Sequence, residues 1–195
     1  MGRLSYAAPT QFADLMLGSS FPENSPSSNA FRMLAHSPSI GSAVLRVAHA
    51  ILTDTDLEPG LRELITLRVA DRCNGRYVWV QHAAIARSVG VSDLMIAALE
   101  RGEALVGLLG DRGRTAFALA DELVDSCRCT DATLESVLDV FSPREVLELL
   151  LLIGYYRMMC VLMTTLDVEV DSPFGVKVLE IARDTPPLQD LGHNG

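Results

Sequence analysis

A long apolar run near the C-terminus restricts this chain to a helical core more strongly than any other feature. It extends from Leu149 to Met163 and follows the sequence SPRE at residues 142–145. This order is typical of a helix N-terminus, where the serine and glutamate side chains each accept a hydrogen bond from a backbone N–H. The run contains Arg157 and stops short of the roughly 18 to 20 residues that a membrane crossing needs. We therefore predict a central, buried helix over about 143–164.

Similar start and stop signals recur along the chain, whereas the alternating patterns typical of strands are hard to find. Serine, threonine or proline opens most segments, and glycine or Asn-Gly closes several of them. The predicted helices cover about 38–50, 60–72, 76–89, 94–101, 112–126, 133–141 and 143–164. The expected fold is all-α, with seven or eight helices.

Length, composition and charge limit the domain organisation and the partners. With 195 residues, 49% of them hydrophobic, the chain suffices for one domain. We expect an N-terminal segment and loop over 1–29, the helical domain over 30–184 and a polar tail over 185–195. The 16 Lys and Arg residues face 25 Asp and Glu, a net charge of −9 that does not attract a phosphate backbone. Because no basic and apolar leader opens the chain, we expect a cytoplasmic protein without nucleic-acid or membrane partners.

The segment over residues 61–93 is the one that indicates chemistry. Glu63 lies on an apolar face of the first predicted helix, and His82 lies on the apolar stripe of the second. A turn at 74–75 would bring these faces together, and a carboxylate in contact with an imidazole can exchange a proton near neutral pH. The same pattern also fits a core histidine whose hydrogen bonds are satisfied and a glutamate on the helix surface.

The order of residues in this segment resembles a known family. The pattern R-E-L-x-x-L from Arg62, followed by N-G-x-Y-x-W-x-x-H-x-x-x-A-x-x-x-G-V-S from Asn74, is similar to the carboxymuconolactone decarboxylase family, which includes the alkylhydroperoxidase AhpD. The stretch over 141–159 resembles the C-terminal helix of that family, so the matches span about 57–170. The resemblance implies an all-helical homo-oligomer, a dimer, trimer or hexamer, with its pocket near subunit contacts.

The peroxidase branch of this family uses two cysteines that this chain does not have. Its motif is Glu followed by C-x-x-C-x-x-x-H, and Glu63 and His82 match the acid and the histidine. Gly75 and Val78 stand at the two cysteine positions. Cys73 lies two residues before the first, but one thiol without a resolving partner cannot complete a redox cycle. Peroxide reduction is therefore the disfavoured alternative.

The decarboxylase branch needs neither cysteine nor cofactor. Its substrate is similar to an unsaturated lactone with a carboxylate, and the lactone itself accepts the electrons that departing carbon dioxide leaves. In this interpretation His82 delivers a proton, and Glu63 orients the imidazole or restores its proton. Tyr77 and Trp79 form walls of the pocket. Val78 stands where this branch commonly has a glutamate. Isomerisation, dehydration or ring closure of a related small acid therefore remain open, as does a non-catalytic helical binding module.

The predicted C-terminal helix supplies further candidates for the substrate site. Tyr156 and Arg157 lie at its middle, and a buried arginine could bind a substrate carboxylate through two parallel hydrogen bonds. Such an arginine more often pairs with an internal acid or reaches the surface, and Trp79 could equally be a core aromatic residue.

The remaining cysteines and the histidines do not indicate a metal site. The thiols of Cys127, Cys129 and Cys160 fit the reduced state of a cytosolic protein. The four histidines lack the H-E-x-x-H spacing, and two cysteines at 127 and 129 would need ligands from distant segments. We therefore expect neither a metal nor a cofactor.

Overall fold

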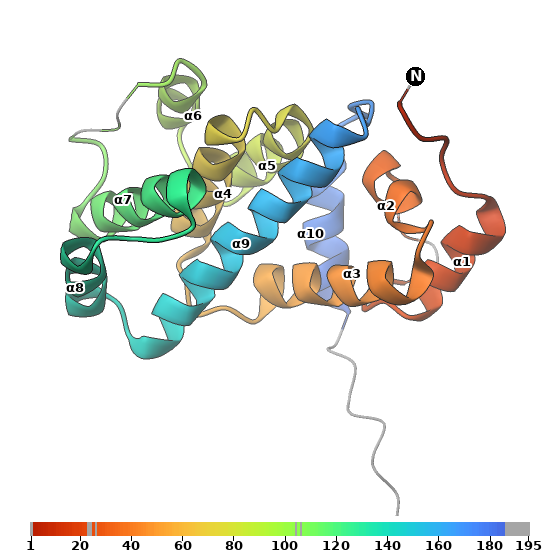
Figure 1. Cartoon of the computed structure of the whole chain (residues 1–195), viewed down its shortest axis with the longest axis horizontal. Helices are drawn as coiled ribbons and strands as arrows, with labels where there is room; N and C mark the ends of the chain where they lie inside the picture. The colour runs from red at the N-terminus through yellow and green to blue at the C-terminus, as the bar shows by residue number, and fades with distance from the viewer. Residues whose placement is uncertain (1, 23–24, 26, 104, 106, 186–195) are drawn as a thin grey trace, which may run out of the picture.

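The computed structural model describes residues 2–22, 25, 27–103, 105 and 107–185. Within these residues it contains ten α-helices and no strand, arranged as in Figure 1. The helices are α1 (Pro9–Leu17), α2 (Asn29–Leu34), α3 (Pro38–Thr53), α4 (Pro59–Arg72), α5 (Arg76–Ser88), α6 (Asp93–Glu100), α7 (Asp111–Ser126), α8 (Asp131–Val140), α9 (Pro143–Thr165) and α10 (Gly175–Asp184). The predicted all-α class is confirmed, and α1, α2 and α10 are helices that the sequence pattern missed.

Side-chain caps fix where several helices begin. At α9, Ser142 accepts a hydrogen bond from the Glu145 backbone N–H, and Glu145 accepts one from the Ser142 backbone N–H at 2.9 Å. At α6 and α8, the Ser92 and Thr130 side chains each accept a hydrogen bond from the backbone N–H three residues later. Each cap satisfies an N–H that the helix itself leaves unpaired, which contributes about 1 kcal/mol.

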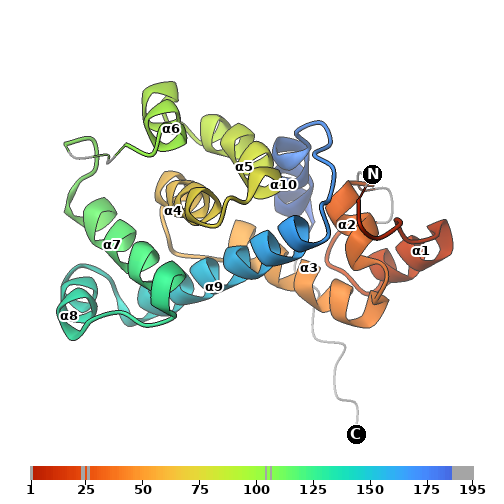
Figure 2. The ribbon, with the colours of Figure 1, turned by 45° about the horizontal axis from the view of Figure 1, so that its top comes forward.

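The hairpin of α4 and α5 forms the centre of the fold. Figure 2 shows α4 surrounded by α5, α7 and α9, and its side chains are buried over most of its length. The chain reverses at Asn74, whose φ of 51° lies in the left-handed region that asparagine tolerates better than most residues. The next residue, Gly75, has no room for a side chain, because a β-carbon at this position would collide with the Cys160 thiol. The predicted turn at 74–75 thus places the two helices side by side.

The long helix α9 runs diagonally across the front of Figure 1. Its inner face packs against α4, α5 and α7 and buries residues such as Leu149 and Ile153. Its outer face is open to solvent, with Leu147 57% and Val161 58% exposed. The prediction that this helix is buried all round is therefore wrong for one face. By length and composition α9 could also cross a membrane, a test that core helices of soluble proteins pass as well.

The N-terminal residues are part of the packed structure. α1 and α2 lie against α3, and α10 covers α3 and α5 from the other end of the chain. A second apolar cluster joins Leu15, Phe21, Leu45 and Leu179 from these segments. The region expected to be an N-terminal segment and loop thus contains a helix that packs on α3. The expected polar tail lies, after residue 185, outside the described residues.

Candidate active site

The middle of the α4–α5 hairpin brings an acid and an imidazole into contact. Glu63 points from α4 toward α5, and its Oε2 lies 2.8 Å from Nδ1 of His82. The Glu63 side chain is 1% exposed and that of His82 is 12% exposed. The two residues are 19 positions apart in the chain, and the antiparallel hairpin is what joins them.

Arg62 completes this arrangement from the neighbouring position on α4. Its Nε donates to Oε1 of Glu63 at 3.1 Å, and its Nη1 donates to the Leu52 carbonyl of α3 at 3.0 Å. Arg62 is only 3% exposed, so its charge is buried together with that of its partner. A buried carboxylate needs such compensation, because an unpaired one would be costly away from water. Arg62 therefore balances the charge of the Glu63 carboxylate and fixes its orientation.

The hydrogen bonds also decide which nitrogen of His82 can act on a ligand. Both oxygens of Glu63 accept hydrogen bonds, one from Arg62 and one from His82. Because an ionised carboxylate is an acceptor only, Nδ1 of His82 carries the proton in this contact. Nε2 is then left as the nitrogen that can accept or deliver a proton, and Glu63 stabilises the imidazolium that forms.

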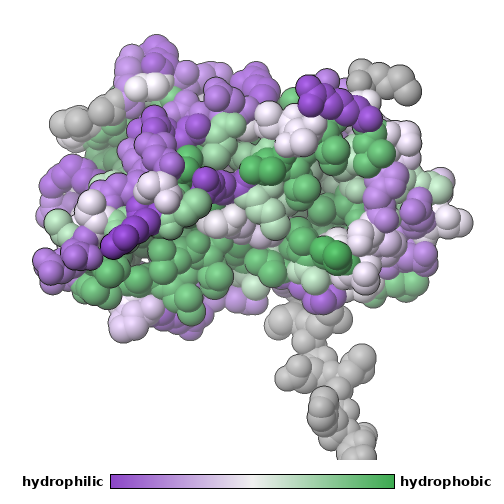
Figure 3. Space-filling view, in the orientation of Figure 1, coloured by the Kyte–Doolittle hydropathy of each residue, from purple (hydrophilic) through white to green (hydrophobic). Residues whose placement is uncertain are grey.

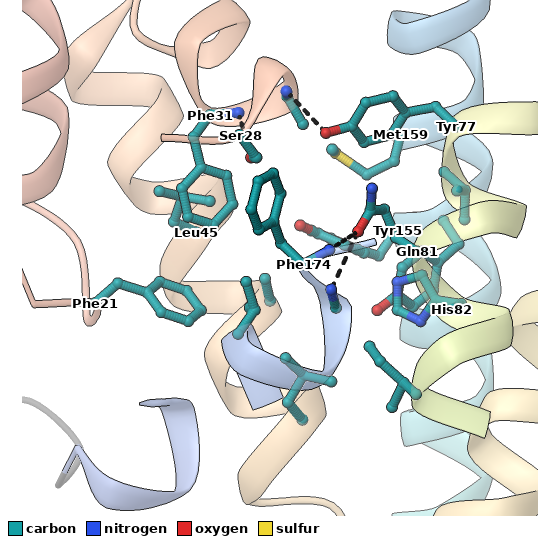
Figure 4. A pocket seen from close by; sticks show the side chains of 18 residues that line it. Phe21, Ser28, Phe31, Leu45, Tyr77, Gln81, His82, Tyr155, Met159 and Phe174 are labelled. Carbon is teal, nitrogen blue, oxygen red and sulfur yellow. Dashed lines mark hydrogen bonds between the residues drawn. The ribbon is translucent and has the colours of Figure 1, made fainter. Parts of the chain in front are cut away.

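A cavity of about 100 Å³ lies beside His82. Figure 4 shows side chains from both ends of the chain converging on it, with Phe21 and Phe31 on one side, Tyr155 and His82 on the other, and Phe174 drawn between them. Among its described lining residues, His82 is the one with an ionisable nitrogen, and most others are aliphatic or aromatic. The lining consists of Phe21, Ser28, Ala30, Phe31, Leu45, Ala48, Leu52, Tyr77, Val78, Gln81, His82, Ile85, Tyr155, Tyr156, Met159, Phe174, Gly175 and Val178.

Three tyrosines of the cavity wall remain protonated well beyond neutral pH. Burial raises the pKa of Tyr77, Tyr155 and Tyr156 above the ordinary value of a phenol. For Tyr156 the nearby Glu63 carboxylate raises the pKa further. The ring of Tyr156 meets the ring of His82 edge to face, with centroids 4.6 Å apart, a favoured geometry for aromatic pairs. Tyr156 therefore fixes the plane of the imidazole without competing for its proton.

Two polar side chains on α5 hold α2 and the start of α10 in place around the cavity. Gln81 Oε1 accepts hydrogen bonds from the backbone N–H groups of Phe174 at 2.8 Å and Gly175 at 3.1 Å, at the start of α10. The Tyr77 hydroxyl accepts one from the Ala30 backbone N–H of α2 at 3.2 Å. Sequence reasoning missed Gln81, although it directly precedes His82, because its partners lie on a helix that was not predicted.

The other candidate substrate residues divide between the cavity and the rest of the fold. Tyr77, Val78 and Tyr156 line the cavity. Trp79 is buried on the opposite side of α5, in a cleft shared with Asn74 and Gly75. Arg157 is not among the described lining residues.

Arg157 points away from the cavity toward α7. Its Nη1 donates to the Leu123 carbonyl at 3.3 Å and contacts the Cys127 sulfur at 2.6 Å. The positive guanidinium group thus lies at the C-terminal end of α7, where it complements the helix dipole, and it shares the Leu123 carbonyl with the Cys127 backbone N–H.

The thiols lie near the turn of the hairpin rather than in the cavity lining. All four cysteines are free. The Cys160 thiol is hydrogen-bonded to the Cys73 sulfur, and burial raises the pKa of both thiols, that of Cys160 to about 12. Val78, at the second cysteine position of the peroxidase motif, contributes only carbon atoms to the cavity wall. In the described part of the chain, no three His, Cys, Asp or Glu residues are grouped closely enough to hold a metal ion.

Comparisons with known proteins cover the segment that contains this hairpin. Residues 38–122 match the model of the Carboxymuconolactone decarboxylase family. This span contains Glu63 and His82 and the whole α4–α5 hairpin. A search of curated proteins finds no match.

Several solved structures share the fold at low sequence identity. A peroxidase-related protein from Ralstonia eutropha JMP134, described as an alkylhydroperoxidase AhpD core, is similar with a TM-score of 0.69 and 18% identity, over 93% of this chain and 96% of that one. The debrominase Bmp8 in complex with 2,3,4-tribromopyrrole has a TM-score of 0.65 and 14% identity, over 89% and 90%. A peroxidase-related protein from Silicibacter sp. TM1040 has a TM-score of 0.65 and 17% identity, over 74% and 76%.

Proposed function

Residues 38–122 of this chain belong to the carboxymuconolactone decarboxylase family, and from this premise we propose that the protein is a cytoplasmic, cofactor-independent lyase of the decarboxylase type. Its substrate would be a small unsaturated lactone or related ring that carries a carboxylate. The observation that supports this most is the buried chain from Arg62 through Glu63 to His82, which ends at a largely apolar cavity. Such an arrangement holds a proton donor of defined tautomer next to a space that is lined mostly by apolar side chains.

The cavity lining favours loss of carbon dioxide from a bound acid. A carboxylate is poorly solvated between aliphatic and aromatic side chains, whereas a transition state with dispersed charge loses less solvation there. As the bond between the carboxyl carbon and the ring breaks, its electron pair moves into the conjugated lactone. The proton on Nε2 of His82 then goes to the ring carbon, and the imidazole recovers a proton from water. Glu63 stabilises the charged ring of His82 before the transfer.

The remaining wall residues would shape and orient the substrate. Tyr77, Val78 and Tyr156 contact the space that it would occupy, and Gln81 holds the start of α10 against α5. We assign no substrate contact to Trp79 or Arg157, which lie outside the described lining. The debrominase of similar fold binds a brominated pyrrole, which supports a small planar ring as the occupant.

Two other activities would use the same scaffold. Isomerisation, dehydration or ring closure needs the same proton transfer by His82 without release of carbon dioxide. Peroxide reduction would require a reactive thiolate, and the raised pKa values of Cys73 and Cys160 disfavour it. Burial of an acid–imidazole pair is costly, and a binding module without catalysis would not need such a pair at its cavity.

The test is turnover in deuterium oxide with a panel of unsaturated lactone carboxylates. We expect carbon dioxide release together with one deuterium on the product carbon. His82→Gln should lower the rate at least about 100-fold, a usual size for loss of a general acid. His36→Gln, the same substitution at an exposed histidine outside the cavity, should leave the rate unchanged. Equal rates for His82→Gln and the native enzyme would exclude His82 as the donor, and deuterium uptake without carbon dioxide would favour an isomerase.

A further inference from the structure

A second cleft lies where the end of α3 leads into α4, and the end of α10 contributes to its lining. Its volume of about 550 Å³ is typical of small-molecule sites. Most of its described lining residues are polar or charged, unlike the cavity beside His82 and the apolar surface that Figure 3 shows along the diagonal of α9. Leu52 lines both spaces, so the cleft and the cavity share a wall.

Two buried side chains of this cleft each have a nitrogen without a hydrogen-bond partner in the described part of the chain. These nitrogens are Nη2 of Arg62 and Nε2 of His49, a residue that is only 2% exposed. Arg62 uses its other two nitrogens on Glu63 and on the Leu52 carbonyl. Buried polar atoms of native proteins are nearly always hydrogen-bonded, because an unpaired one loses its interaction with water. The two nitrogens therefore indicate a polar ligand that supplies the missing hydrogen bonds.

The neighbours of His49 decide what its free nitrogen can do. Nδ1 of His49 lies 3.3 Å from the hydroxyl oxygen of Thr53. This hydroxyl has one proton, which it can donate to the His49 carbonyl at 2.9 Å or to Oδ1 of Asp54 at 3.0 Å. Its oxygen then accepts the proton of Nδ1, and Nε2 of the neutral imidazole is an acceptor. The cleft thus offers a ligand a cationic donor in Arg62 and a neutral acceptor in His49.

Carboxylates lie at the opening of the cleft. Asp54, Asp56 and Glu58 are exposed residues of its lining, and Arg183 is the one exposed arginine among the described lining residues. Asp56 pairs with Arg144 at 3.3 Å, and both oxygens of Glu58 accept backbone N–H groups of α4. Asp54 accepts only the Thr53 hydroxyl among the described side chains. A simple anion would be repelled by these acids, and a simple cation by the buried guanidinium, whereas a ligand with both charges satisfies both groups.

We propose that this cleft binds a free amino acid in its zwitterionic form. The carboxylate of the ligand accepts a hydrogen bond from Nη2 of Arg62, since a planar guanidinium matches a carboxylate in shape and charge. The ammonium group donates to Nε2 of His49 and to the carboxylate of Asp54. On its other side Arg62 donates to Glu63, so the amino acid contacts the residue that orients the acid of the neighbouring cavity.

Nitrogen NMR of histidine-labelled protein at constant pH tests this proposal, because His49 lines the cleft and not the cavity beside His82. The probes are the standard L-amino acids, with acetate and methylammonium as the two charged halves. At least one amino acid should shift Nε2 of His49 saturably at millimolar concentration, while the exposed His36 keeps its resonances. Acetate and methylammonium should each bind at least about tenfold more weakly, because each lacks one charged contact. An unshifted His49 with every amino acid, or equal affinity for acetate, would overturn the proposal.

Two variants test the contacts of the ammonium group. Asp54→Asn, at an exposed position, should leave the circular dichroism unchanged and lower the affinity for the amino acid about tenfold. Asp139→Asn is the matched control, an exposed aspartate of α8 outside the cleft, and should bind as the native protein does. His49→Phe keeps an aromatic ring against Phe21 but removes the acceptor, and equilibrium dialysis should show the same loss. Native affinity in Asp54→Asn would contradict the proposal. Lactone turnover does not enter these measurements, so the amino acid site and the proposed lyase activity fail separately.

Discussion

The middle and the turn end of the α4–α5 hairpin join the same two helices with opposite chemistry. In the middle, Glu63 and His82 share a hydrogen bond and His82 lines the cavity. Near the turn, Gly75 leaves space that the Cys160 thiol fills, and this thiol donates a hydrogen bond to the Cys73 sulfur. The middle is polar, ion-paired and open to a ligand, whereas the turn end is filled and its thiols are protonated. The difference teaches that one helix hairpin can hold an ion-paired acid and imidazole beside a cavity and, near its turn, a filled contact between protonated thiols.

Substitution of Glu63 should have the largest effect on turnover and stability, because it removes the ion pair in the middle of the hairpin. Glu63→Gln removes the charge that stabilises the imidazolium and leaves the buried Arg62 guanidinium without an ionised partner. We expect turnover to fall about 100-fold and the free energy of unfolding to fall by about 3 kcal/mol. Urea unfolding and the lactone assay measure both. Glu135→Gln, at an exposed position on α8, should change neither, and equal behaviour of the two variants would contradict the role of Glu63.

Alkaline pH should lower the free energy of unfolding, because the buried thiol of Cys160 lies at the turn end of the hairpin. The pKa of Cys160 in the folded protein is about 12, above the ordinary 9. The unfolded chain therefore loses this proton first, so the stability from Cys160 is complete below pH 9 and is lost as the pH rises toward 12. Between pH 9 and 10 the loss should approach about 1 kcal/mol. Urea unfolding of the native protein and of Cys160→Ala should show a shallower pH dependence in the variant; parallel curves would contradict the burial of a protonated thiol.

Filling the space at the turn should destabilise the fold by an amount that depends on the neighbouring residue. Gly75→Ala places a methyl group against Cys160 and should lower the free energy of unfolding by about 1 to 3 kcal/mol. Combined with Cys160→Ala, the same change should cost less than the sum of the single effects, because the clash is gone. Strict additivity in thermal unfolding would mean that the two positions do not share this space.

The smallest expected effect concerns the thiols in catalysis. Cys73→Ser should leave turnover within about twofold of the native enzyme, because the proposed mechanism uses no sulfur. With a thiol reagent at pH 7 the exposed Cys127 should react first and the buried Cys160 only on unfolding, which mass spectrometry can follow. Loss of turnover in Cys73→Ser, without loss of folding, would bring the peroxidase alternative back.

Local signals in the sequence were sufficient for the central helices and for the acid–imidazole contact. The sequence at 142–145 predicted the start of α9 because its cap involves residues three positions apart. The contact of Glu63 with His82 followed from helical spacing and a short turn, both of which are local. Long-range partners do not enter such reasoning, and for these two residues none was needed.

The cavity walls and the outer face of α9 could not be predicted in the same way. Phe21 and Phe174 reach the cavity from segments far apart in the chain, and neither α1 nor α10 had a pattern strong enough to be predicted. For α9, apolar residues on every side do not indicate which of them the neighbouring helices cover. The partner of Arg157 likewise lies far away in the sequence: it is the carbonyl of Leu123 on α7, 34 positions earlier, and not a group in the cavity.

The central claim is that His82 holds one proton toward Glu63 and presents its other nitrogen to a ligand. Nitrogen NMR of protein with labelled histidine tests this most directly, without the need for turnover. Neutral His82 should carry its proton on Nδ1, and an unsaturated lactone carboxylate should shift the Nε2 resonance of His82 alone among the four histidines. A proton on Nε2 with a bare Nδ1, or a ligand that shifts no resonance of His82, would contradict the account.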